Sequence, residues 1–148
     1  MSRLPVLAAA ATLAAAAAAA AFGIYELVHR SGTVGSVPPV VSASGLVERS
    51  GVRVTRVAVT GDGGLVDLRW LVVDADKAAA VNDRPPLLID ERTGGVVDRP
   101  WMGHAHTHGL KLGVGYYVIF ENSGMLIRPG ARVTVQLGNA RLAHVKVQ

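Results

Sequence analysis

The chain is predicted to be an all-β protein: an antiparallel immunoglobulin-like β-sandwich of seven or eight strands, preceded by one N-terminal transmembrane helix. Three observations predict this. Apolar and polar side chains alternate from residue 52 onward, Gly- and Pro-containing turns recur through the same region, and the first thirty residues are apolar and rich in alanine. Alternation is the period of a strand buried on one face. Short strands separated by turns over about a hundred residues are typical of a sandwich.

Residues 1–30 are expected to hold a membrane anchor or a signal segment. Residues 4–25 carry no charge, and as a helix they would span roughly 33 Å, which suits one bilayer crossing. Ala-x-Ala triplets in the same run also suit cleavage by a signal peptidase. We favour a retained single-pass anchor in the cell membrane, contacting lipid through residues 4–28, because the run exceeds a usual signal core. The C-terminal domain is then extracytoplasmic, or secreted if the segment is cleaved.

Residues 31–44 are expected to form a flexible linker, because they are uncharged and rich in Gly, Ser and Pro. This composition, which extends to Val47, argues against a helix. An alternative is that Val40 and Val41 belong to a first strand. The folded β-sandwich domain is therefore expected at residues 45–148.

The first strands follow from the positions of large apolar side chains. From residue 66 to residue 72 every second residue is apolar, with Trp70 expected at the centre of the core, while Asp67 and Arg69 face the other way. The apolar positions change parity between residues 52–54 and 57–59, which predicts a β-bulge near Thr55 and Arg56. Residues 61–64, Gly-Asp-Gly-Gly, predict the hairpin turn between these two strands.

Five more segments are predicted strands because they alternate or are rich in β-forming residues between turns. They are residues 87–91, 96–98, 116–121, 133–137 and 141–147. Residues 128–131, Arg-Pro-Gly-Ala, predict a type II turn. In the last strand Ala143, Val145 and Val147 are expected to point inward. One helical turn is predicted at residues 74–81, capped by Asp74, and residues 90–91 are expected to be a solvated strand end.

Several segments of the domain carry a resemblance to a known group of proteins. They are Gly51–Val54, Val66–Trp70, Val73–Ala78, Leu87–Glu91, Tyr117–Asn122 and Ile127–Gly130. Together they resemble an uncharacterised family of bacterial exported or membrane-anchored small immunoglobulin-like β domains. The resemblance covers nearly all of the folded part. It implies the fold and the compartment, but it transfers no catalytic or ligand residue.

A histidine-rich segment is the strongest candidate for chemistry. In extended backbone, His104, His106 and His108 project to the same side, within reach of one copper, zinc or nickel ion. Met102 offers a soft sulfur ligand, as does Met125 if the fold brings it near, so copper is the preferred ion. The alternative is a solvated loop that binds nothing tightly. A protonation-sensitive contact with a partner is a third reading.

Other functional classes find less support in the sequence. The chain has no cysteine, so it forms no disulfide and no thiolate metal site. Basic residues are mixed with acidic ones and lack an aromatic stacking platform, which argues against nucleic-acid binding. Ser123 lacks a nucleophile-elbow motif, and His144 is expected to be an exposed surface residue.

The expected function is therefore a non-enzymatic binding or accessory domain beside a membrane protein complex. The alternative is a carrier of copper or zinc that uses His104, His106 and His108, with Met102 as an additional ligand.

Overall fold

The fold is described from a computed structural model, which describes residues 36–101 and 109–148. Contacts divide the chain into Met1–Val37 and Pro38–Gln148, and the fold below concerns the second unit. The predicted anchor or signal segment lies outside the described residues. Within the described ranges, no helix is both long enough and apolar enough to cross a bilayer.

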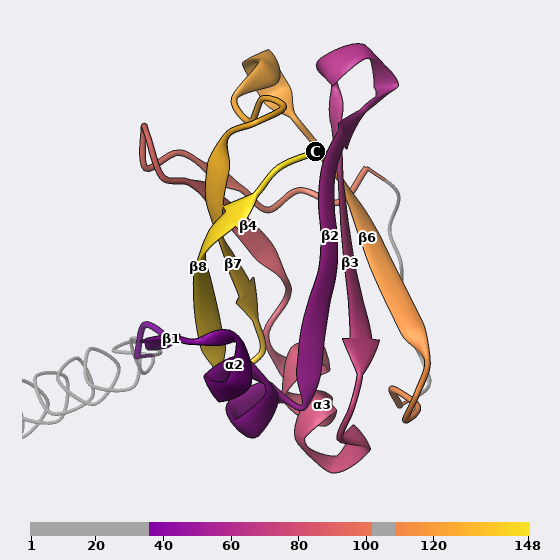
Figure 1. The fold of residues 1–148 in the computed structure, drawn as a ribbon. Coiled ribbons are helices and arrows are strands. Elements are labelled where there is room, and N and C mark those ends of the chain that lie inside the picture. Colours follow the sequence, from indigo (N-terminus) through magenta and orange to yellow (C-terminus); the bar gives the residue numbers. More distant parts are fainter. Residues whose placement is uncertain (1–35, 102–108) are drawn as a thin grey trace, which may run out of the picture. The chain divides into compact units, whose positions relative to one another are not determined.

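This part of the chain is mostly β, with eight strands in two sheets and two short α-helices. The larger sheet has the order β1-β8-β7-β4-β5, and the smaller sheet has the order β2-β3-β6. The sheets face each other, with α2 and α3 at one end (Figure 1). The strands are β1 (Val40–Val41), β2 (Val52–Thr60), β3 (Leu65–Val72), β4 (Leu87–Asp90), β5 (Val96–Val97), β6 (Gly115–Glu121), β7 (Arg132–Leu137) and β8 (Ala140–Lys146); the helices are α2 (Ala43–Ser50) and α3 (Ala75–Asp83).

The inward faces of both sheets form one apolar core, which confirms the predicted mostly-β, two-sheet architecture. The predicted alternation of β3 is confirmed, because Val66, Leu68, Trp70 and Val72 are all buried. Trp70 is buried at the centre of the strand, and its ring stacks on Tyr116 of β6 at 6.4 Å between centroids. The opposite sheet contributes Leu88, Val133, Val135 and Leu137.

Two irregularities interrupt the strand pairing. The bulge predicted near Thr55 is confirmed, because the β2–β3 register shifts between Val54 and Arg56. A second shift lies between β7 and β8, where His144 has a φ of 62°. The extra residue in β8 changes which side chains face the core. Leu142 and Val145 pack on the core, and the expectation that Ala143 points inward is wrong.

The first described elements lie partly within the segment expected to be a linker. Val40 and Val41 pair in parallel with β8, as the alternative interpretation has it. α2 follows at once, with Ser42 as its N-cap: the hydroxyl accepts a hydrogen bond from the Gly45 N–H at 3.1 Å. The expectation that this composition excludes a helix is therefore wrong, since the cap and the burial of Leu46 outweigh the low helix propensity of Ser and Gly.

Gly51 joins α2, β2 and α3. It ends α2 with a φ of 61°, and a Cβ there would lie 2.2 Å from the Asp74 carbonyl oxygen, so only glycine fits. The Gly51 carbonyl accepts hydrogen bonds from the N–H groups of Val73 and Asp74. Asp74 caps α3 as predicted, accepting from the Lys77 N–H, and this backbone hydrogen bond holds the pKa of Asp74 below its usual value. The helix is longer than the single turn expected.

Candidate binding face

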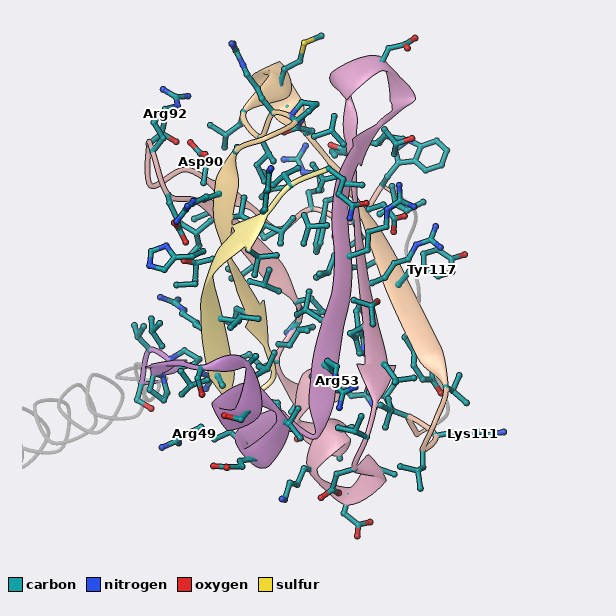
Figure 2. The ribbon with its side chains drawn as sticks, in the orientation of Figure 1. Arg49, Arg53, Asp90, Arg92, Lys111 and Tyr117 are labelled. Atoms are coloured by element: carbon teal, nitrogen blue, oxygen red, sulfur yellow. The ribbon has the colours of Figure 1, made fainter. Side chains whose placement is uncertain are left out.

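The outer face of sheet β2-β3-β6 gathers basic and aromatic side chains. Arg56 of β2 lies opposite Arg69 of β3, and Arg69 lies opposite Tyr117 of β6. Directly opposite residues in antiparallel strands project to the same side of the sheet, so these three side chains form one row. Arg53 lies on the same face nearer to α2, and Figure 2 labels it together with Tyr117. We call Arg53, Arg56, Asp67, Arg69 and Tyr117 the arginine face.

The guanidinium of Arg69 is held from two directions. Its Nε donates a hydrogen bond to Oδ2 of Asp67 at 2.7 Å, and its Cζ lies 6.0 Å from the centroid of the Tyr117 ring. The Arg69 side chain is 52% exposed and that of Asp67 only 9%. The terminal amino groups of Arg69 bond to no residue that the structure describes. They remain available as a planar pair of donors.

Asp67 is buried although it belongs to an outer face. It lies in register between Ala58 of β2, which is also buried, and Ile119 of β6. Its Oδ1 has no hydrogen-bond partner within the described part of the chain. Among the described residues, the hydrogen bond from Arg69 is therefore the one strong polar contact of this carboxylate. It holds the Arg69 side chain against the surface of the sheet.

The remaining members of the arginine face are exposed. Arg53 and Arg56 make no hydrogen bond or ion pair with any residue in ranges 36–101 and 109–148. The side chain of Tyr117 is 47% exposed. Trp101, 50% exposed, extends the sheet beside β6, since its N–H donates to the Ile119 carbonyl at 2.8 Å. Exposed Arg, Tyr and Trp are the side chains most enriched among the residues that dominate binding energy in protein interfaces.

On the outer face of the larger sheet, five polar side chains form two bonded groups, while exposed Arg132 of β7 lies opposite exposed Lys146 of β8. Oε1 of Glu91 accepts hydrogen bonds from the His144 N–H at 2.6 Å and from the Thr134 hydroxyl at 3.0 Å. Oε2 of Glu91 lies 2.8 Å from Nδ1 of His144. Nearby, Nε of Arg141 donates to Oε1 of Gln136 at 3.0 Å. We call Glu91, Thr134 and His144 the glutamate clamp.

The glutamate clamp changes the acidity of its carboxyl group. Burial alone would raise the pKa of Glu91, but hydrogen bonds from the backbone and ring of His144 and from Thr134 together hold that pKa below its usual value. The expectation of a solvated strand end at residues 90–91 is wrong. Asp90 is buried and accepts hydrogen bonds from the N–H and hydroxyl of Thr93, which closes the hairpin turn. His144 is exposed, as expected.

A small hollow lies where β5 approaches the end of β6. Its volume is about 140 Å³, and the Arg99–Glu121 ion pair, 3.3 Å long, lies in its wall. Ligand pockets usually measure about 300–1,000 Å³. The hollow is lined by Val96, Val97, Asp98, Arg99, Glu121, Ser123 and Leu126. Its size does not suit a small-molecule substrate.

The predicted metal ligands cannot be placed. Met102, His104, His106 and His108 lie outside the described residues. Met125 is exposed in the short turn after β6. Within the ranges 36–101 and 109–148, no three His, Asp or Glu side chains are grouped so that they would hold a metal.

Comparisons with known family models, curated proteins and solved structures give no match to the chain. The resemblance of the sequence to exported β domains therefore stays a prediction.

Sequence reasoning placed Asp67 and Arg69 on one outer face but missed their pairing with each other, for which the Asp-x-Arg spacing within a strand was the available signal. It could not place Arg56 and Tyr117 beside them, because that depends on the register of three strands.

Proposed function

We propose that the protein is a non-enzymatic binding or accessory domain that is held at the outer side of the cell membrane and binds a protein partner through the arginine face. The proposal rests on one observation. Arg56, Arg69 and Tyr117 form a row on the outer face, and half-exposed Trp101 lies at the edge of the same sheet. Arg, Tyr and Trp are the residue types most enriched among the side chains that dominate binding energy in protein interfaces.

The strand order supports the immunoglobulin-like part of the proposal. Strands β2, β3 and β6 take the places of strands A, B and E of that fold, and β4, β7 and β8 take the places of C, F and G. β5 occupies the place of strand C′, next to β4. Sandwiches of this type are common in cell-surface proteins. Because a fold alone does not fix a function, the argument for binding rests on the arginine face.

The parts of the proposal that concern membrane anchoring and export rest on the sequence alone. The uncharged residues 4–25 have the length of one bilayer crossing, and the basic Arg3 precedes them. On this proposal, residues 4–28 contact lipid and the sheet domain meets a partner within a membrane protein complex. A reporter fused to the C-terminus and found in the cytosol would overturn this part.

Photo-crosslinking in intact cells tests the proposal directly. A benzoyl-phenylalanine replaces Tyr117 in the full chain, and in a matched protein it replaces Arg132, an exposed residue of β7 in the other sheet. We expect a discrete adduct with one membrane-associated protein from position 117 and none from position 132. Equal adducts from both positions, or none from position 117, would overturn the proposal.

The carrier of copper or zinc that uses His104, His106 and His108 stays a prediction from the sequence.

A further inference from the structure

We infer that the partner presents a carboxylate to the arginine face, so that Arg69 binds an Asp or Glu side chain of an acidic protein segment and Arg56 supplies a second cationic donor. This inference rests on the proposed function and names the chemistry of its partner. It starts from the way the structure holds one guanidinium.

Arg69 is prepared for a second carboxylate. Asp67 occupies its Nε at 2.7 Å, and the Tyr117 ring lies 6.0 Å from its Cζ, so two contacts restrict the side chain. An arginine fixed in advance loses less conformational entropy when it forms a further bond. Its two terminal amino groups point as a fork that matches the two oxygens of a carboxylate. The free donors therefore define a site for one bidentate anion.

The charge of the face favours an acidic partner. Three arginines, Arg53, Arg56 and Arg69, share it with one aspartate, Asp67, which leaves an excess of two positive charges. At the edge of the same face, Arg99 and Glu121 form a neutral pair. Arg56 lies directly opposite Arg69, so their like charges repel until an anion comes between them.

The same face fits a protein better than an anionic lipid surface. Lipid recognition uses clusters of about four to eight Lys or Arg residues, whereas this face carries three arginines, one of which is already paired with Asp67. Exposed Trp101 and Tyr117 supply the aromatic surface typical of protein interfaces. The acidic segment is thus expected to carry apolar residues beside its carboxylates.

A peptide titration tests the inference on the full chain in a neutral detergent. The probe is a short synthetic peptide of alternating Glu and Gly, and its control has Gln in place of Glu. We expect the Glu peptide to shift the NMR signal of the Arg69 Nε–H group and the Gln peptide to leave it unmoved. Arg69→Gln and Arg56→Gln should each weaken binding about tenfold, and the matched Arg132→Gln on the other sheet should leave it unchanged.

Two further arms separate the alternatives. Arg69→Lys keeps the charge but loses the fork, and we expect it to weaken binding nearly as much as Arg69→Gln. Equal binding of both peptides, or equal weakening by Arg132→Gln, overturns the inference. So does Arg69-dependent binding to phosphatidylglycerol vesicles without binding of the Glu peptide, which would assign the face to lipid.

The two proposals fail in different ways. If the photo-crosslink from position 117 persists in an Arg69→Gln, Arg56→Gln chain, the binding function stands and the carboxylate site is wrong. If the Glu peptide binds through Arg69 but no cross-link forms in cells, the carboxylate site stands and the proposed function is wrong.

Discussion

The best-held charged side chain differs between the two outer faces of this sandwich: Glu91 has both carboxylate oxygens bonded, whereas the terminal amino groups of Arg69 have no partner among the described residues. On the larger sheet, both carboxylate oxygens of Glu91 are hydrogen-bonded, to Thr134 and His144, and Arg141 donates a hydrogen bond to Gln136. On the smaller sheet, only one of three arginines has a carboxylate partner among the described residues. The first arrangement stabilises the fold and leaves little for a ligand. The second contributes little to the fold and leaves donors that a ligand can use.

The strongest test of this contrast removes the glutamate clamp. Glu91→Ala deletes the acceptor of bonds from the His144 N–H and the Thr134 hydroxyl, and we expect the free energy of unfolding to fall by about 2 kcal/mol. Urea denaturation measures it. The control Glu48→Ala removes an exposed acid of α2 and should change stability by less than about 0.5 kcal/mol. Equal losses in both variants would mean that the clamp is not special.

Acid should weaken the clamp by a smaller amount. The pKa of Glu91 is lower in the folded chain than its usual value of 4.5, so its contribution to stability is fully present above the unfolded pKa and is lost as pH falls through the folded pKa. We expect the stability difference between the natural chain and Glu91→Gln to shrink below about pH 5. A difference that stays constant down to low pH contradicts this.

On the arginine face, the substitution Asp67→Asn should lower the free energy of unfolding less than Glu91→Ala does, but it should weaken peptide binding. Asp67→Asn weakens the charge-assisted bond to Arg69, yet Arg69 is half-exposed and one Asp67 oxygen already lacks a partner in the described residues. We expect stability to change by less than about 1 kcal/mol. The Arg69 Nε–H signal should move and the Glu peptide should bind more weakly. Unchanged peptide binding would show that Asp67 does not position Arg69.

Arg56→Gln should leave the fold nearly untouched. Its side chain is exposed and makes no polar contact with the described residues, so the expected change in unfolding free energy is below about 0.5 kcal/mol. A slightly more stable variant would fit equally well, since it removes a repulsion with Arg69. A loss above about 1 kcal/mol would mean that Arg56 serves the fold.

The smallest effect on stability is expected at the predicted metal segment. We expect urea denaturation to be unchanged when His104, His106 and His108 are replaced together by alanine. On the carrier prediction, the natural chain binds copper(II) and zinc in calorimetric titrations and this variant loses that binding. If both proteins bind these ions equally weakly, the carrier prediction is wrong. Calcium, which prefers oxygen ligands, is the control ion.

Sequence periodicity predicted the elements that depend on local pattern. The bulge in β2 could be found because valines stand on both sides of it and visibly change parity at Thr55 and Arg56. The bulge in β8 could not, because small and apolar residues occupy both parities there and a non-glycine residue such as His144 seldom adopts a positive φ. α2 was missed since its cap Ser42 sits in a Ser- and Gly-rich run that suits a linker equally well.

The candidate binding face was only half predictable. The alternation of β3 places Asp67 and Arg69 outward without any knowledge of the fold. The row with Arg56 and Tyr117 depends on which strands are neighbours and on a register shifted by the β2 bulge. The clamp on Glu91 likewise joins residues that are far apart in the sequence and meet across three strands. Long-range pairing of this kind leaves no local trace.

The parallel pairing of β1 with β8 has a mechanical consequence. The Arg141 N–H donates to the Pro39 carbonyl, so the residues around β1 are bonded to the last strand. Tension applied between Pro38 and Gln148 pulls these two strands in opposite directions along their length, and their hydrogen bonds share the force instead of opening one after another. Resistance to forced extension would then be set by the unfolding rate, and a Val41→Pro chain, which loses the β1 N–H that faces β8, should rupture at lower force.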